Sequence, residues 1–239
     1  MTPRRVHLPP ERIEAGRGRL TPEARHYLAE VLRLAPGAEV EVFDGRGGRY
    51  AGRLDPGLET VSLGPREDAR APGAEIALLF ALSKGEKVDL VVQKATELGA
   101  ARIAPFAAER SVVRLDGAKG EDRARRWRRI AEEAARQCGR ADVPEISAPV
   151  PLERALVALA PGTAAVVFQP GGASLGTLAP PPAGLAAIVG PEGGLSGAEV
   201  QACERAGAAR ASLGPRVLRA ETAAIVAVAL LQARFGDLS

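Results

Sequence analysis

From residue 75 onward, short apolar runs alternate with stretches of helical periodicity, and this alternation restricts the possible folds more than any other feature. The apolar runs lie at 76–82, 103–106, 164–168, 185–189 and 209–213. The helical stretches lie around 86–98, 121–138, 152–159, 197–206 and 219–235. Buried strands that are joined by helices form parallel sheets, because a crossover is needed to return the chain to the same edge. The pattern therefore predicts an α/β domain with a mostly parallel sheet.

The segment 4–66 predicts a smaller, β-rich unit. Alternating polar and apolar residues at 39–43 and a second strand at 49–54 flank the turn residues of 44–48, as in a hairpin. Before the hairpin, Thr21 can cap a helix that ends before Pro36.

Residues 65–73 are rich in Pro, Arg and acidic residues, as is typical of a linker. We therefore place a domain boundary there, with an N-terminal domain at 1–70 and a C-terminal domain at 71–239.

Composition narrows the class of protein. Apolar residues make up 46% of the chain and aromatic residues only 3%, so the core must consist mainly of Ala, Val and Leu. There is no apolar run of about 18 residues, the length that a membrane span needs. Cys138 and Cys203 have no partner at metal-ligand spacing. We expect a cytoplasmic protein with free thiols, no membrane segment and no metal.

The basic residues are almost all arginine. The chain has 28 Arg and 4 Lys, a net charge of +3 and a pI near 9.2. Guanidinium groups suit phosphate and base recognition, although a GC-rich genome or a thermophilic source would produce the same bias. Two groups of arginines are candidate RNA-binding patches, namely Arg4, Arg5, Arg12, Arg17 and Arg19, and then Arg123, Arg125, Arg126, Arg128 and Arg129.

A glycine-rich loop at 190–194 joins a buried strand to a helix. Ligands of parallel sheets bind beyond the carboxyl ends of the strands, so this loop stands where a site is expected. Ser196 and Glu199 form a capping box that begins the next helix. A lone glycine-rich turn is more often merely a turn. The chain has neither the dinucleotide-binding nor the nucleoside-triphosphate fingerprint.

A second loop of similar character, at 212–219, leads into a final helix that is apolar nearly all round. Such a helix must be buried in the domain or against another subunit. Arg219, Glu221 and Thr222 are polar residues at the start of this helix and are therefore candidates for function.

Together these stretches resemble a known family. Gly-Pro-Glu-Gly-Gly at 190–194 and Leu-Gly-Pro-Arg-Val-Leu-Arg-Ala-Glu-Thr-Ala at 213–223 resemble the closing motifs of the SPOUT methyltransferases. Within that superfamily the chain is most similar to the RsmE family, which methylates N3 of a uridine in bacterial small-subunit (16S) ribosomal RNA. The stretches 83–99 and 134–140 resemble further motifs of the family, and the N-terminal unit resembles its PUA-like RNA-binding domain.

The resemblance implies a C-terminal SPOUT domain whose last segment is threaded as a trefoil knot, a small PUA-like β-barrel domain, and a homodimer. It also implies that S-adenosylmethionine (SAM) binds between three loops. Carried over by position, the cofactor-binding residues are Val167, Phe168, Gln169, Gly190, Pro191, Glu192, Gly193, Leu213, Gly214, Leu218, Arg219, Thr222 and Ala223. The chain departs from the family at 169–172, where it has no charged residue, so a polar role for that loop is in doubt.

Transfer of a methyl group to uracil N3 requires loss of the N3 proton. A cation near a uracil oxygen would stabilise the resulting anion. Arg219 is the candidate, with Arg216 as the alternative. Glu221 could orient Arg219 or accept the proton, but a carboxylate in a first helical turn is equally well explained by the helix dipole.

Three classes of function compete at this point. They are an RNA methyltransferase of this or another SPOUT specificity, an RNA-binding protein without catalysis, and an α/β enzyme acting on a small metabolite. The intact glycine-rich loops favour the first class.

Overall fold

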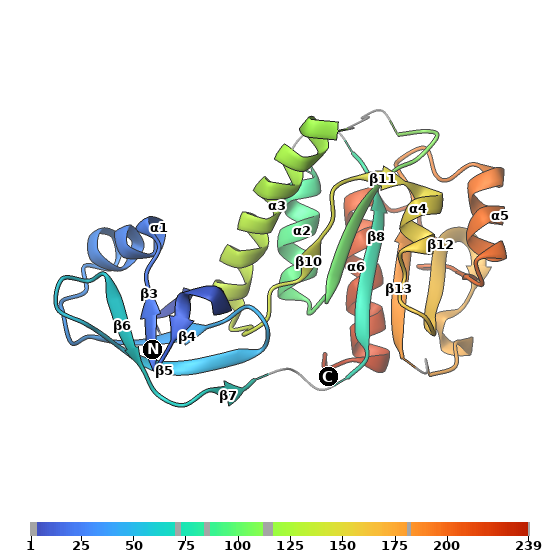
Figure 1. Cartoon of the computed structure of the whole chain (residues 1–239). Helices are drawn as coiled ribbons and strands as arrows, with labels where there is room; N and C mark the ends of the chain where they lie inside the picture. The colour runs from blue at the N-terminus through green and yellow to red at the C-terminus, as the bar shows by residue number, and fades with distance from the viewer. Residues whose placement is uncertain (1–3, 70–72, 84–86, 112–116, 181–182, 239) are drawn as a thin grey trace. The chain divides into compact units, whose positions relative to one another are not determined.

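The computed structural model describes residues 4–69, 73–83, 87–111, 117–180 and 183–238 (Figure 1). The chain divides by its internal contacts into two compact units. The first comprises Met1–Ala71 and Glu132–Val143, and the second comprises Pro72–Ala131 and Pro144–Ser239. The expected boundary between residues 70 and 71 lies outside the described residues and stays a prediction.

The second unit contains a sheet in which every strand pairing is parallel. The strand order is β10-β9-β8-β13-β12-β14, with β11 also pairing with β9. The strands are β8 (Glu75–Ala81), β9 (Arg102–Ala107), β10 (Glu145–Ile146), β11 (Val150–Pro151), β12 (Thr163–Ala173), β13 (Gly184–Val189) and β14 (Ala209–Ala211). The central strand β13 is buried along its whole length, which agrees with its unbroken apolar sequence.

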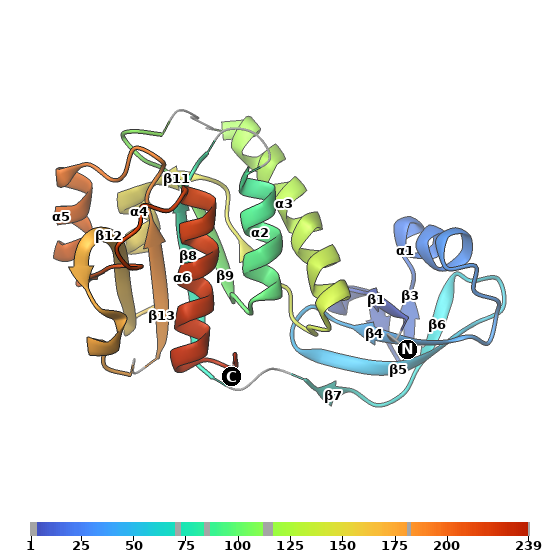
Figure 2. The same cartoon turned by 180° about the vertical axis from the view of Figure 1, so that it is seen from behind.

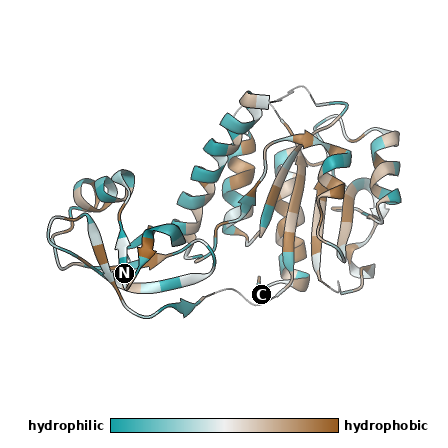
Figure 3. Cartoon of the chain, viewed as in Figure 1, coloured by the Kyte–Doolittle hydropathy of each residue, from teal (hydrophilic) through white to brown (hydrophobic). Residues whose placement is uncertain are grey.

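Helices cover both faces of this sheet. On one face α2 (Lys87–Glu97) packs against α6 (Ala220–Phe235), which contacts β13 and β8. On the other face α4 (Leu152–Val157) packs against α5 (Gly197–Arg205), as the opposite views of Figures 1 and 2 show. Figure 3 shows mostly apolar strands in this sheet and helices of mixed polarity around it. A short 3-10 helix (Leu175–Thr177) precedes β13.

A long helix, α3 (Gly117–Cys138), begins in the second unit. Its buried Trp127 donates a 3.0 Å hydrogen bond from Nε1 to Asp89 of α2, which holds the two helices together. All five expected strands and five expected helices of this unit are confirmed. The main difference is β12, which continues to Ala173 through the segment expected to be a loop, with an irregular register after Phe168.

The first unit is built on a mainly antiparallel sheet of order β1-β4-β5-β6-β3-β2, with β7 also pairing with β5. Its strands are β1 (Arg5–His7), β2 (Ile13–Glu14), β3 (Arg17–Arg19), β4 (Glu39–Phe43), β5 (Gly48–Leu54), β6 (Thr60–Leu63) and β7 (Glu67–Asp68). The expected hairpin is confirmed as β4 and β5. A 3-10 helix (Pro10–Arg12) follows β1.

Two expectations for this unit need correction. Thr21 does cap α1 (Pro22–His26), but the α-helix ends there and continues as a π-helical turn (Tyr27–Val31), in which Val31 is exposed. The start of the expected linker is not free chain, because β7 pairs with β5 and Arg66 binds Asp44 at 3.2 Å.

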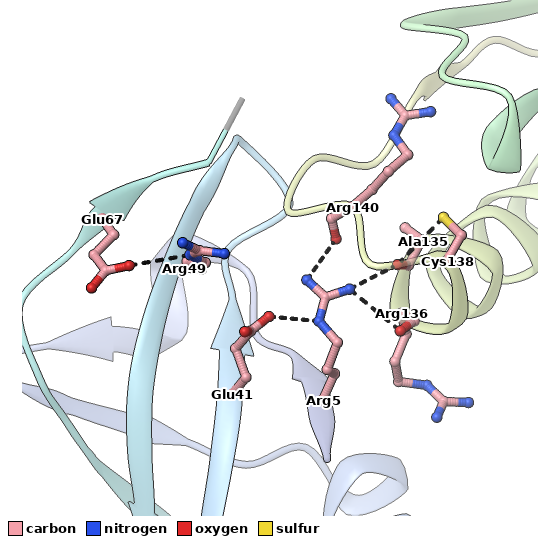
Figure 4. A network of polar contacts seen from close by, with 8 residues as sticks. All are labelled: Arg5, Glu41, Arg49, Glu67, Ala135, Arg136, Cys138 and Arg140. Carbon is pink, nitrogen blue, oxygen red and sulfur yellow. Dashed lines mark hydrogen bonds and ion pairs between the residues drawn. The ribbon is translucent and has the colours of Figure 1, made fainter. Parts of the chain in front are cut away.

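The first unit also includes the end of α3 and the loop that follows it. Arg5 of β1 is 4% exposed and donates hydrogen bonds to the carbonyl oxygens of Ala135, Arg136 and Arg140 at 3.1, 3.4 and 3.0 Å (Figure 4). Its Nε also lies 2.6 Å from Glu41. The guanidinium therefore adds hydrogen bonds to carbonyl oxygens in the last turn of α3 and in the loop that follows it. Arg5 was expected in an RNA-binding patch, but its side chain is used inside the fold.

Candidate functional site

The carboxyl ends of three neighbouring strands meet at one edge of the parallel sheet. Phe168 of β12 is in register with Val189 of β13 and with Ala211 of β14. Ala81 of β8 is in register with Phe106 of β9, so the loop after β9 leaves the sheet at the same edge. Four segments that are distant in sequence are thereby brought together where ligands of parallel sheets bind.

A cavity of about 380 Å³ lies at this edge. Such a volume falls within the usual range for small-molecule sites, roughly 300–1,000 Å³. It is lined by Arg110, Phe168, Gln169, Pro170, Val189, Gly190, Pro191, Glu192, Gly193, Gly194, Leu195, Ser212, Leu213, Gly214, Arg216, Val217, Leu218, Ala220 and Ala223. Apolar side chains and glycine backbone dominate this lining, so a ligand would meet mainly backbone groups and carbon atoms.

The cavity brings together most of the residues that the sequence assigned to the cofactor. Ten line it, namely Phe168, Gln169, Gly190, Pro191, Glu192, Gly193, Leu213, Gly214, Leu218 and Ala223. Val167, Arg219 and Thr222 do not. Val167 is fully buried in β12, and Thr222 is exposed on α6. Arg110 is the charged lining residue that the sequence did not single out; its only signal was a position just after a strand.

The glycines of the loops have different roles. Gly194 and Gly214 adopt positive φ angles of 69° and 101°, which disfavour a residue with a side chain. Gly190 has no positive φ, but a Cβ there would lie 2.9 Å from both Cγ and the backbone nitrogen of Leu195. Gly193 has neither restriction, since its Cβ would make ordinary contacts with Arg110.

The loop at 190–194 is joined to α2 by an ion pair. Lys87 Nζ donates a 2.7 Å hydrogen bond to Glu192 and lies 3.5 Å from Glu221 Oε2. This hydrogen bond raises the pKa of Lys87 above its ordinary value and lowers the pKa of Glu192 below its own. One ammonium group thus lies between two carboxylates, one from the loop at 190–194 and one from the first turn of α6.

Glu221 and the two candidate arginines differ in their surroundings. Glu221 Oε2 is buried and forms no hydrogen bond with the described residues, so the Lys87 ammonium is its nearest partner. Arg219 is the N-cap residue of α6 and is exposed, whereas Arg216 is exposed and lines the cavity. Neither guanidinium forms a hydrogen bond or ion pair with the part of the chain that the structure describes.

The expected capping box at the start of α5 is confirmed. Ser196 Oγ accepts a hydrogen bond from the Glu199 amide, and Glu199 Oε2 accepts one from the Ser196 amide. The other Glu199 oxygen accepts a 2.8 Å hydrogen bond from the Glu109 amide. A buried carboxylate therefore joins the loop after β9 to the start of α5.

Among the residues that the structure describes, no group of three or more His, Cys, Asp or Glu side chains is arranged to hold a metal ion. None of the described helices combines the length and apolar character needed to span a bilayer.

Comparison with known proteins decides the family. Residues 70–232 match a family model described as an RNA methyltransferase domain, and residues 20–62 match an RNA methyltransferase PUA domain. A Bacillus subtilis protein, ribosomal RNA small subunit methyltransferase E, is 30% identical over 226 residues, which cover 89% of this chain and 88% of that protein. The chain belongs to the ribosomal RNA small subunit methyltransferase E family. A Synechocystis relative with the same name is 34% identical over 96% of this chain and 77% of its own.

A solved structure agrees with this family assignment. The chain is similar to ribosomal RNA small subunit methyltransferase E from Neisseria gonorrhoeae, solved bound to S-adenosyl methionine, with 31% identity, a TM-score of 0.88 and full coverage of both chains. The expected fold class is confirmed in its main parts, a SPOUT domain with a parallel sheet and an N-terminal PUA domain. The threading of the last segment as a trefoil knot stays a prediction.

Proposed function

We propose that this protein is a cytoplasmic methyltransferase that transfers the methyl group of SAM to N3 of a uridine in small-subunit ribosomal RNA. The observation that carries the proposal is the cavity between the ends of β12, β13 and β14, in a chain that matches a SAM-bound relative along its whole length. The residues present suit this cofactor: the cavity is of the right size, and its lining offers apolar contacts and backbone polar groups.

When bound, SAM supplies an electrophilic methyl group on a sulfonium. The task of the protein is to align the acceptor nitrogen and to manage charge. A close approach to the backbone is possible at Gly194 and Gly214, which line the cavity and have open space in the direction of a Cβ.

Loss of the N3 proton leaves negative charge on the uracil oxygens. Arg219 is our candidate for the cation that stabilises this charge, and Arg216 is the alternative. The exposed position of Arg219 suits contact with RNA, while the position of Arg216 on the cavity suits contact with either substrate. Glu221 is the candidate proton acceptor, because its buried Oε2 has an unused hydrogen-bonding position.

The first unit is proposed to contribute RNA affinity. Its sheet carries a hollow of about 900 Å³ whose lining includes Arg4, Arg49, Tyr50 and Arg53. Guanidinium groups beside an aromatic ring suit phosphates and unstacked bases. Arg49 and Arg53 are paired with Glu67 and Glu39 in the protein alone, so RNA would exchange these pairs for phosphate contacts.

We propose a homodimer on the basis of α6. This helix has the most apolar sequence in the chain, yet Leu230 is 41% exposed and Ile225, Val226 and Ala229 are half-buried. Light scattering should give twice the chain mass, and Leu230→Glu should shift the mass toward that of a single chain.

The test of the function is methylation of small-subunit RNA with isotopically labelled SAM, followed by nucleoside mass spectrometry. We expect 3-methyluridine. A different methylated nucleoside would indicate another specificity of the SPOUT class. RNA binding without methyl transfer would indicate a binding protein, and SAM binding without RNA binding would indicate an enzyme of small metabolites.

A further inference from the structure

The loop after β9 places an arginine on the rim of the cavity. Arg110 Nη1 donates a 2.9 Å hydrogen bond to the carbonyl oxygen of Gly193. The side chain also passes over Gly193, since a Cβ on that glycine would lie 3.5 and 3.6 Å from Cβ and Cδ of Arg110. Arg110 therefore packs on the glycine-rich loop, although Arg110 and Gly193 are 83 positions apart in the chain.

The backbone that carries Arg110 is held from both sides. The preceding amide, of Glu109, donates to the carboxylate of Glu199, which is only 8% exposed and also caps α5. The following residue, Ser111, closes a turn with Ala108, through a backbone hydrogen bond of 3.0 Å and a contact of 3.2 Å between the Ala108 amide and Ser111 Oγ. The position of Arg110 is thus defined by the fold before any ligand binds.

The charge of Arg110 is not neutralised by a carboxylate of the described residues. A guanidinium has five N–H donors, and the Gly193 carbonyl uses one of them. The acidic residue on the cavity, Glu192, is already hydrogen-bonded to Lys87. The remaining donors of Arg110 are therefore available to an anionic oxygen of a ligand in the cavity.

We propose that Arg110 binds the carboxylate of the methionine part of SAM. The inference rests on the proposed function, which assigns this cavity to SAM. Arg110 is hydrogen-bonded to the glycine-rich loop at 190–194. Arg216 belongs to the loop at 212–219, which also carries Arg219, the residue proposed to act on the uridine. A planar guanidinium matches a carboxylate with two parallel hydrogen bonds. The cofactor is thereby fixed at its amino-acid end, independently of the RNA.

The test is a comparison of two ligands and two variants by calorimetry. Arg110→Ala should weaken SAM binding by about 10- to 100-fold, the effect of one lost charge-assisted contact. Decarboxylated SAM, which lacks the anion, should bind wild type and Arg110→Ala alike. Arg110→Lys should recover part of the SAM affinity. The matched control is Arg205→Ala, because Arg205 is an exposed arginine at the end of α5 that does not line the cavity.

Other results would overturn the proposal. An equal loss of affinity for SAM and for decarboxylated SAM in Arg110→Ala would mean that Arg110 only supports the loop. Unchanged SAM affinity with weaker RNA binding in Arg110→Ala would mean that Arg110 binds an anionic group of the RNA. Failure of the wild-type protein to bind either ligand would instead refute the assignment of the cavity to SAM, and so is distinguishable from failure of the Arg110 proposal.

Discussion

Lys87 at the start of α2 donates a 2.7 Å hydrogen bond to Glu192 in the glycine-rich loop, 105 positions further along the chain. The contact joins the loop at 190–194 to α2, and the nearby Glu221 carboxylate brings the start of α6 to the same ammonium. Lys87 is therefore a positioning residue for the cavity and not part of its lining.

The Lys87 contact should make SAM binding depend on pH in a defined direction. The pKa of Glu192 is lowered, so the pair is intact at neutral pH and is lost as the pH falls through that lowered pKa. The pKa of Lys87 is raised, so the pair also persists into the alkaline range. Calorimetry at a series of pH values should show SAM affinity falling on the acid side in the wild type. Lys87→Met should have weaker affinity at neutral pH and a flatter acid profile; an unchanged profile would contradict the positioning role.

Glycine substitutions should separate the roles of the loop residues. Gly190→Ala places a Cβ 2.9 Å from Leu195, so the loop must shift and SAM affinity should fall. Gly194→Ala has space but a φ of 69°, which should lower the free energy of unfolding by about 1–2 kcal/mol. Gly193→Ala is the matched control for stability, because Gly193 has no positive φ and a Cβ there makes only ordinary contacts; the free energy of unfolding should change little. Denaturant unfolding and calorimetry measure both quantities, and equal effects for the three variants would contradict this division.

Arg5→Ala should destabilise the protein strongly. The variant removes the guanidinium hydrogen bonds to carbonyl oxygens in the last turn of α3 and in the loop after it, and also removes the ion-pair partner of Glu41. Breaking a buried network of this kind costs about 3–5 kcal/mol. Arg5→Lys should recover only part of the lost stability, because an ammonium group cannot donate to as many acceptors at once. Arg4→Ala, at an exposed neighbouring residue, should be nearly neutral in thermal denaturation. Similar losses for Arg4→Ala and Arg5→Ala would argue against the network.

The two cysteines should differ in reactivity. Cys203 is fully buried in α5, and burial raises the pKa of its thiol to about 11, whereas Cys138 is exposed. Because the thiolate is the reactive form, iodoacetamide at pH 8 should modify Cys138 alone in the native protein and both cysteines after denaturation. Mass spectrometry of the alkylated protein checks this. The same shift means that stability falls as the pH rises from 9.0 toward 11, where only the unfolded chain ionises this thiol.

Arg219→Ala should lower the rate of methyl transfer by about a hundredfold or more while leaving SAM affinity nearly unchanged, if it stabilises the uridine anion. The measurement is single-turnover methylation at saturating SAM, with Arg216→Ala as the comparison. A near-normal rate for Arg219→Ala and a large loss for Arg216→Ala would transfer the role to the residue that lines the cavity.

Much of the second unit could be predicted from local patterns. The buried strands have continuous apolar sequences, and signals such as the Ser196 to Glu199 capping box act over a few residues. The glycine-rich loops could be assigned to the site because strand ends in a parallel sheet share an edge. What local patterns do not contain is the pairing of distant elements. The contact of Arg110 with Gly193 and that of Lys87 with Glu192 depend on strand order, which periodicity does not specify.

The burial of Arg5 also depends on distant contacts that local sequence does not reveal. As one of several arginines near the N-terminus it was assigned to an RNA-binding patch, because charge in a sequence is normally read as surface. Its burial depends on acceptors at 135–140, more than a hundred residues away.

The first unit is made from two separate pieces of chain, Met1–Ala71 and Glu132–Val143. A gene fusion with one junction near residue 71 would therefore transplant a PUA-like sheet without the helix end that Arg5 contacts. It would also separate Phe43 from Ala135 and Ala141, with which it forms a small buried cluster. Exchange of this unit between enzymes would require two coordinated junctions or matching sequences at 132–143. We expect the two units of this family to have been inherited together, and swapped chimaeras to fold only when both pieces come from the same parent.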